Sequence, residues 1–352
     1  MPRTVFVLLL LLVNAISVAA GAELELTPVR AAITRSIPWL EKDMVAWRES
    51  NDCAACHHGP MYVWSSHVAR RQGYPVNEKQ LQDYARWMIE DEKARVFPSQ
   101  APSAPLTSST SAADRMTALM MGHRNLSQPT LYLAHALNAL PPGDPLVSAG
   151  WQKLQQHWRE AQMDDGSFAG RKGWPPIFNS PKILTLFAAT ALEDRQGAGM
   201  DARELKRSLD QIQQRTASFL ASQQPDATHQ GLVLRLLLQT QFGAGPQPLL
   251  DEILALQRED GGWSQTPDSS SDAFATGQSL YALSRAGVQL SEKSLVQGLN
   301  FLVKSQAGDG TWPMTSRASP ETGRPADDLN PITYAATAWA TIGMASYVHN
   351  AR

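Results

Sequence analysis

The chain has 352 residues, of which 43% are hydrophobic, and its formal net charge is −2. This near-neutral charge excludes the strongly basic surface that a nucleic-acid partner requires. The length is sufficient for one large hydrophobic core or two ordinary ones.

The first twenty residues have the features of a secretory signal peptide. Arg3 supplies the positive charge, Val5 to Val13 form an unbroken apolar run, and Ala20-Gly21-Ala22 offers a small-x-small cleavage site. A membrane-spanning helix needs about 20 apolar residues, which this run does not reach. We therefore expect a signal peptide at 1–20, one domain at 21–352, no stable transmembrane anchor, and a periplasmic or secreted location. The alternative is an uncleaved anchor.

Both cysteines of the chain lie in one short segment, Cys53-Ala54-Ala55-Cys56, directly before His57. Exported proteins usually use cysteines to join distant segments, because closing a longer loop removes more chain entropy. Cys-x-x-Cys-His is the attachment sequence of c-type haem, in which the thiols add to the porphyrin vinyl groups and the histidine is the proximal iron ligand. We expect one covalent haem c on Cys53 and Cys56, with His57 bound to the iron.

Two other interpretations of this box remain open. Cys53 and Cys56 are spaced like a vicinal redox disulfide, although the βαβ pattern that hosts a thioredoxin-like motif is missing. Cys53, Cys56, His57 and His58 could instead hold a metal ion, although two adjacent histidines rarely both reach one tetrahedral ion.

Hydrophobic residues recur with helical spacing along the chain, and no sustained period-two alternation predicts strands. Six helical hairpins are predicted. Their first helices are expected near 34–49, 77–93, 144–161, 201–222, 246–257 and 291–305, and the partners near 60–73, 116–140, 180–194, 228–241, 272–286 and 331–346. The partners are apolar nearly all round, which is typical of helices packed on most of their circumference. The connection from Phe97 to Ser111 is rich in Pro and Ser, and is interpreted as a flap or a disordered segment.

Three turns between these helices share the pattern Gln-x-x-x-Gly-x-aromatic. They run from Gln162 to Phe168, from Gln257 to Trp263 and from Gln306 to Trp312. The last two start 49 residues apart, and the first two 95 apart, about twice that distance. This spacing is typical of an array of supersecondary units. The fourth hairpin has only Gln223-Gln224-Pro225-Asp226 at the corresponding place.

These turns resemble the QW repeats of the squalene-hopene cyclase and prenyltransferase family. The resemblance implies an all-α (α/α)6 toroid, in which inner helices ring a central cavity, outer helices surround them, and QW turns brace the joins. It covers most of the mature chain and rests on three motifs. Six hairpins, the number that closes the ring in that family, favour a closed toroid over an open solenoid.

The activities of that family are not expected here. The Asp-x-Asp-Asp acid of the cyclases is missing, since adjacent aspartates occur only at Asp164-Asp165 and Asp327-Asp328. The zinc site of the protein prenyltransferases needs a cysteine, and none remains outside the box.

The first hairpin can be superposed on the fifth by aligning Arg71-Gln72-Gly73 with Arg285-Ala286-Gly287. The box then lies at the level of the QW turns, at a mouth of the ring. His123 is the preferred sixth iron ligand, followed by Met120 or Met121. His67 and His135 occupy equivalent positions on the first two inner helices. An open sixth site would favour ligand chemistry over electron transfer.

The sequence therefore predicts an exported c-type haem protein on a cyclase-like toroid, active in periplasmic redox chemistry. It would exchange electrons with a periplasmic redox partner, or convert an apolar molecule held in the ring cavity. Two alternatives stay open. One is a lipid- or terpenoid-binding or haem-sensing module without turnover. The other is a secreted polysaccharide lyase with a structural Cys pair, for which His229, Tyr281 and Arg235 are candidates. Asp272 is expected to be an N-cap.

Overall fold

The computed structural model describes residues 26–51, 53–54, 58–97, 126–141, 143–169, 180–194, 203–241, 245–318 and 323–349. These residues form twelve α-helices and one short 3-10 helix, η1 (Glu92–Ala94), and the only β-type pairing among them is two isolated bridges. No helix in this part of the chain is both long and apolar enough to cross a membrane. The expected signal peptide and the stretch 98–111 lie outside the described residues.

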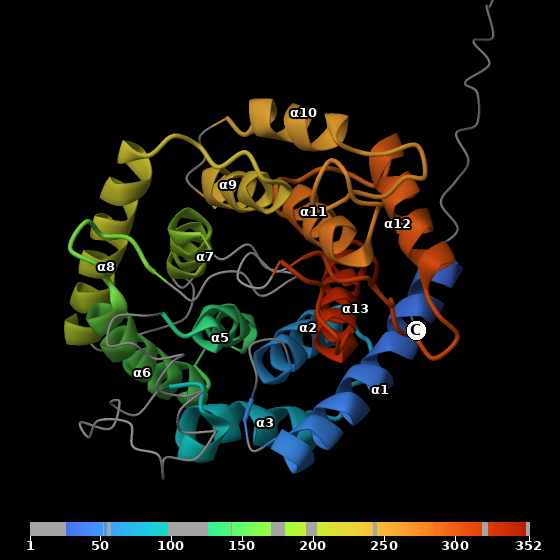
Figure 1. Ribbon diagram of the computed structural model, residues 1–352. Coiled ribbons are helices and arrows are strands. Elements are labelled where there is room, and N and C mark those ends of the chain that lie inside the picture. Colours follow the sequence, from blue (N-terminus) through green and yellow to red (C-terminus); the bar gives the residue numbers. More distant parts are fainter. Residues whose placement is uncertain are drawn as a thin grey trace, which may run out of the picture.

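Six inner helices form a closed ring, which Figure 1 shows nearly end-on. They are α2 (Gly59–Arg71), α5 (Gln128–Ala139), α7 (Pro181–Asp194), α9 (His229–Gln241), α11 (Ala273–Arg285) and α13 (Asn330–Ala345). Each contacts the next in this order, and α13 contacts α2. This closure confirms the toroid and excludes an open solenoid.

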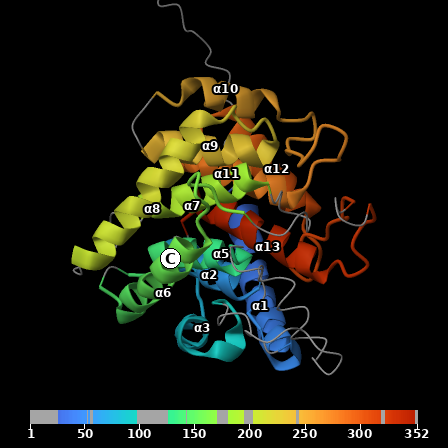
Figure 2. The ribbon, with the colours of Figure 1, turned by 60° about the vertical axis from the view of Figure 1, so that its left-hand side comes forward.

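Six outer helices surround this ring, as Figure 2 also shows. They are α1 (Leu26–Asn51), α3 (Glu78–Glu90), α6 (Pro145–Ala161), α8 (Arg203–Ser222), α10 (Gln247–Ala255) and α12 (Lys293–Ser305). Each precedes its inner partner in the chain, so the described residues form the six hairpins that the periodicity predicts.

Helix bounds differ clearly from the expected ones at two places. The first helix begins at Leu26, eight residues earlier than position 34, because Val29, Ala32 and Ile33 continue the buried face. The second inner helix was expected from 116, but α5 begins at Gln128. Pro129 suits the first turn of a helix, where its missing N–H is not needed. Positions 116–125 lie outside the described residues.

The glutamine of each QW turn joins two successive outer helices. Its side-chain amide donates to the glycine carbonyl of its own turn and to a backbone carbonyl of the next outer helix. The second bonds run from Gln162 to Ile212 (3.1 Å), from Gln257 to Ser294 (2.7 Å) and from Gln306 to Ala32 (2.9 Å). The last of them links α12 to α1 and so closes the outer ring.

The aromatic residue of each QW turn is bonded to its inner helix. The backbone N–H groups of Phe168, Trp263 and Trp312 donate to the hydroxyls of Thr185, Thr276 and Thr337 at 2.9, 2.9 and 3.2 Å. Both buried tryptophans also donate Nε1–H to a carbonyl of the preceding outer helix. The repeated residues therefore make the same hydrogen bonds in each unit, which satisfies buried polar groups at every joint.

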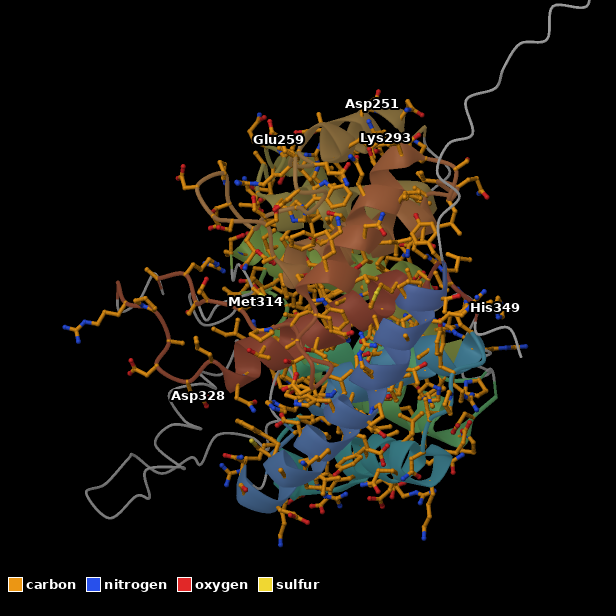
Figure 3. The ribbon with its side chains drawn as sticks, turned by 90° about the vertical axis from the view of Figure 1, so that its right-hand side faces the viewer. Asp251, Glu259, Lys293, Met314, Asp328 and His349 are labelled. Atoms are coloured by element: carbon orange, nitrogen blue, oxygen red, sulfur yellow. The ribbon has the colours of Figure 1, made fainter. Side chains whose placement is uncertain are left out.

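The two faces of the ring carry opposite ends of the inner helices. In Figure 3, Met314 and Asp328, which precede α13, lie at one face, and His349, which follows it, lies at the other. His58, which precedes α2, is hydrogen-bonded to Asn330 at the start of α13. The turn before α2 therefore lies at the N-terminal mouth of the ring, as the alignment of the first and fifth hairpins predicts.

Candidate functional site

The described part of the Cys-x-x-Cys-His box is anchored on two sides. Trp47 on α1 donates Nε1–H to the Cys53 carbonyl at 3.1 Å, and the Ala54 N–H donates to the Ala94 carbonyl of η1 at 2.8 Å. Ala54 is buried, whereas the Cys53 thiol is free and partly exposed. Cys56 and His57 lie outside the described residues, as do His123, Met120 and Met121.

His58, which follows the box, is the most firmly held side chain of this region. Its imidazole is fully buried and lies between the rings of Trp47 and Tyr334, with both centroids 4.1 Å away. Its Nε2 lies 3.1 Å from Asp43 Oδ2 and 3.2 Å from Asn330 Oδ1. Because both of these atoms are acceptors, Nε2 carries the proton and donates to them.

The charges around His58 follow from this arrangement. Burial lowers the pKa of His58, and the nearby Asp43 carboxylate opposes that shift only in part, so the imidazole is neutral at pH 7. Burial also opposes the charge of Asp43, but the hydrogen bonds from His58 and Asn330 outweigh it, and the pKa of Asp43 lies below its ordinary value. A neutral histidine thus donates to a charged carboxylate.

This geometry bears on the four-ligand metal site that the sequence left open. His58 Nε2 is protonated and engaged by two acceptors, and the ring is closed in by two aromatic side chains. A nitrogen that binds a metal must be deprotonated and must face the ion. Nε2 of His58 is therefore not available to a metal ion, and the ring is fully buried between two aromatic side chains.

Sequence reasoning missed the residues that hold His58. Asp43 lies 15 positions away and Asn330 lies 272 positions away, so no local pattern connects them with the box. Trp47 and Tyr334 belong to amphipathic and apolar helices, where an aromatic residue carries no special signal. Only the closure of the ring brings α1 and α13 to this point.

The two histidines on equivalent inner-helix positions have different surroundings. His135 stacks on Trp64 with centroids 4.7 Å apart, and its Nε2 lies 3.3 Å from the Thr190 hydroxyl. His67 is buried, and neither of its ring nitrogens has a hydrogen-bond partner among the described residues. Burial lowers the pKa of each to about 4, so both are neutral at pH 7.

An aromatic cluster crosses the centre of the ring. Trp64 on α2 lies 5.7 Å from Tyr281 on α11 and 4.9 Å from Trp339 on α13, measured between ring centroids. Since α2 and α11 are not neighbours in the ring, their contact spans its interior. Trp64 and Tyr281 therefore occupy part of the ring interior at this level. Two hollows lined by described residues lie on the outer helices, along α1 and between α6 and α8.

Asp272 is confirmed as the N-cap of α11. Its Oδ1 accepts from the Ala275 N–H at 2.8 Å, and its Oδ2 accepts from Gln265 Nε2 at 3.1 Å. Burial raises its pKa to about 6 despite these hydrogen bonds.

The residues considered for a lyase do not form a group. His229 Nε2 is hydrogen-bonded to the Ser279 hydroxyl at 2.8 Å, and Arg235 points to the Asp226 carbonyl at 3.5 Å. Tyr281 belongs to the aromatic cluster. None of the three candidates is hydrogen-bonded to another in the described part of the chain.

Solved structures with a similar fold include a type II terpene cyclase from Scytonema in complex with its product merosterolic acid A. It has a TM-score of 0.54 and 14% sequence identity, and the match covers 91% of this chain and 98% of that one. A protein from Actinoplanes matches with a TM-score of 0.52 and 14% identity over 90% of this chain and 99% of that one. No protein-family model and no curated protein matches the sequence. At this identity the similarity shows the fold alone, a cyclase-like α/α toroid.

Proposed function

We propose that this chain is an exported c-type haem protein that works in electron transfer. One haem c is attached through Cys53 and Cys56, and His57 is the proximal iron ligand. The observation that carries the proposal is that the only two cysteines of the chain stand in a Cys-x-x-Cys-His sequence. The signal-like N-terminus supports a periplasmic location, where a periplasmic redox partner would be available.

The described residues are compatible with such an attachment. The Cys53 thiol is free and partly exposed, as thioether formation with a large porphyrin requires. His58 is buried and engaged by Asp43 and Asn330, which leaves His57 as the histidine of the pair for the iron. A bound haem would supply a one-electron iron couple.

The surrounding residues favour electron transfer over turnover. Trp47, His58 and Ala54 fix the backbone at both ends of the box, and a rigid frame keeps the ligand geometry constant between oxidation states. Trp64 and Tyr281 also occupy part of the ring interior, which supports electron transfer over conversion of a molecule held there. We include His123 as the sixth ligand, with Met120 or Met121 next, because electron-transfer haems usually have two axial protein ligands.

Mass spectrometry tests the attachment. The full chain is produced in a host with cytochrome c maturation machinery, and the exported protein is denatured before measurement. We expect the mass increment of one haem, its loss in the Cys53→Ala, Cys56→Ala double variant, and its retention in His67→Ala, whose histidine lies away from the box on α2. Export of the wild-type chain without haem would refute the proposal.

Carbon monoxide tests the role. For electron transfer we expect a low-spin ferrous spectrum and no rapid CO adduct, because a protein side chain fills the sixth position. Rapid CO binding would contradict that role, and would favour ligand chemistry or sensing at the haem.

A further inference from the structure

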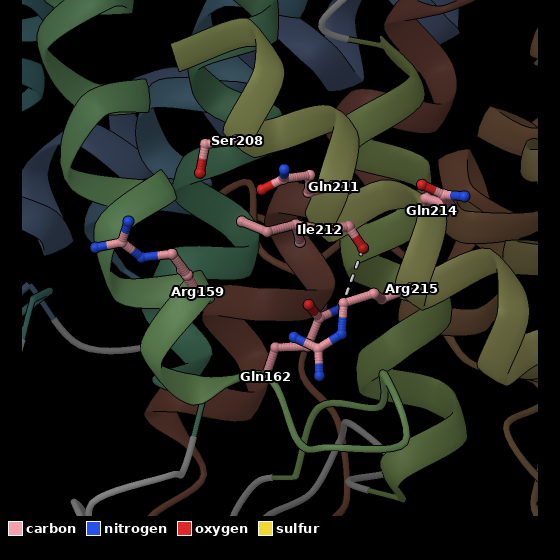
Figure 4. A pocket seen from close by; sticks show the side chains of 7 residues that line it. All are labelled: Arg159, Gln162, Ser208, Gln211, Ile212, Gln214 and Arg215. Atoms are coloured by element: carbon pink, nitrogen blue, oxygen red, sulfur yellow. Dashed lines mark hydrogen bonds between the residues drawn. The ribbon is translucent and has the colours of Figure 1, made fainter. Parts of the chain in front are cut away.

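A hollow of about 270 Å³ lies on the outside of the ring between α6 and α8. Figure 4 shows its lining from the end of α6 and from one side of α8. The lining residues are Arg159, Gln162, Ser208, Gln211, Ile212, Gln214 and Arg215. Two of them are arginines and none is acidic, so the hollow is suited to a small anion.

Gln162 leaves one buried acceptor in this hollow without a donor. Its Nε2 lies 3.1 Å from each of three acceptors, the carbonyls of Gly166 and Ile212 and the Thr216 hydroxyl, which fixes the orientation of the amide. Its Oε1 is buried and accepts no hydrogen bond from a described residue, and the residue as a whole is only 5% exposed. A buried carbonyl oxygen without a donor costs about 1–3 kcal/mol, so a ligand that donates to it is favoured.

The same place in the last QW turn shows how this oxygen is otherwise satisfied. There Gln306 Oε1 accepts from Arg35 Nη2. Arg35 corresponds to Arg215, since Gly310 and Gly166 approach the carbonyls of these two residues. Arg215 instead donates Nη2 to the Met163 carbonyl at 2.7 Å. The hollow at α6 and α8 therefore lacks a donor that its counterpart has.

Two polar residues of the lining are particular to this joint. The hydrogen bonds of the three glutamines set the register between the joints. In that register Leu254 and Val303 stand where α6 has Arg159. Leu290 and Pro28 stand where α8 has Ser208. The position of Arg215 is polar at all three joints, with Gln297 at the second and Arg35 at the third, so Arg159 and Ser208 distinguish the hollow.

Two donors are available to an anion in the hollow. Arg159 forms no hydrogen bond or ion pair with another described residue, and its guanidinium has five N–H donors. Ser208 accepts from Gln155 at 2.6 Å, which leaves its own O–H to donate. Arg215 adds a second positive charge beside the buried Gln162.

We infer that this hollow binds a small oxyanion that carries its own O–H group, with the anionic oxygens on Arg159 and Arg215 and the O–H donating to Gln162 Oε1. Hydrogen phosphate groups and hydroxycarboxylates share this chemistry. Sulfate and acetate have the charge without the donor. The site is independent of the haem box.

Isothermal titration calorimetry of the full chain at pH 7, in a phosphate-free buffer of constant ionic strength, tests the inference with four probes. Inorganic phosphate is compared with sulfate, and glycolate with acetate. We expect at least one donor-bearing anion to bind 10-fold or more tighter than its partner without a donor, because that partner leaves Gln162 Oε1 unpaired. Binding of phosphate alone or of glycolate alone identifies the ligand group.

Two variants separate the site from general surface charge. Arg159→Gln is expected to weaken binding of the preferred anion at least 10-fold, since it removes a charge-assisted contact. Arg207→Gln removes an exposed arginine of α8 outside the hollow and is expected to leave affinity unchanged. Equal affinity within both probe pairs, no binding of phosphate or glycolate, or equal loss in the two variants would overturn the inference.

Discussion

Gly310 is the residue on which the closure of the outer ring can be tested most sharply. It has a φ of 93°, and a Cβ built on it would lie 2.5 Å from the Arg35 carbonyl oxygen of α1. Gly310→Ala therefore introduces a strained backbone conformation and a collision with backbone that no side-chain rotation relieves.

Two other glycines separate these contributions. Gly287 has a φ of 79° but nothing within 4 Å of its Cβ position, so Gly287→Ala measures the backbone cost alone, about 1–2 kcal/mol. Gly308 lies in the same turn as Gly310 but has no positive φ and no atom within 4 Å of its Cβ position. Gly308→Ala should therefore leave the free energy of unfolding unchanged or raise it by up to about 1 kcal/mol. Gly310→Ala adds an overpacking cost of about 1–3 kcal/mol to the backbone term, a total of about 2–5 kcal/mol.

The assay is urea unfolding of the full chain followed by far-UV circular dichroism, with the free energy of unfolding compared across the three variants. We expect the order Gly308→Ala, Gly287→Ala, Gly310→Ala from most to least stable. A Gly310→Ala variant whose unfolding free energy lies within about 0.5 kcal/mol of that of Gly308→Ala would refute the close approach of this turn to α1.

Two further predictions concern buried titratable side chains. His58→Ala removes two ring stacks and the hydrogen bonds to Asp43 and Asn330, and is expected to lower the free energy of unfolding by about 3–5 kcal/mol. His58→Phe keeps the stacks, so its melting temperature should lie between those of His58→Ala and the wild type. A melting temperature of His58→Ala within about 2 °C of the wild type would contradict the stabilising role of these contacts. Asp272 has its pKa raised to about 6 by burial, so the folded state binds its proton more tightly than the unfolded state and the stability that Asp272 provides falls as pH rises from about 4 to 6. Asp272→Asn keeps the capping oxygen but does not titrate. Its free energy of unfolding should therefore rise relative to that of the wild type by up to about 3 kcal/mol between pH 4 and pH 7. If urea unfolding gives the same difference between the two proteins over this range, the raised pKa of Asp272 is excluded.

The fold could be predicted from the sequence because its signals are local and repeated. Gln257, Gly261 and Trp263 mark a turn whose hydrogen bonds recur at the other two motifs, and the helix spacing between them is regular. Most helix bounds follow from this pattern. The early start of α1 was missed because Pro28 and Thr27 look like a loop, whereas burial of Val29 and Ile33 against the last hairpin makes this turn helical.

The candidate site could be predicted only in part. The proposed haem-binding residues are close together in the sequence, whereas the residues that hold the neighbouring side chains are not. The motif is contiguous in the sequence and can be recognised without a structure; it contains Cys53, Cys56 and His57. The role of His58 depends on its hydrogen bond to Asn330, and that of Gln162 depends on Arg215 donating to the Met163 carbonyl. Both roles can therefore be recognised only in the folded structure. The contact of Trp64 with Tyr281 across the ring interior could not be predicted either, since an aromatic residue on an apolar helix does not reveal which neighbour it meets.

The position of His58 connects the box with the closure of the ring. Asp43 and Trp47 come from the first helix of the chain and Asn330 and Tyr334 from the last, and all four meet on this one imidazole. The same seam is bonded further along, where the Tyr334 hydroxyl donates to the Leu40 carbonyl at 3.0 Å and the Ser36 and Thr341 hydroxyls lie 2.7 Å apart. A five-residue sequence is enough to define the proposed haem attachment. The residues that hold His58, directly after the box, come together only when the first and last hairpins meet, so this support depends on the stability of the whole ring.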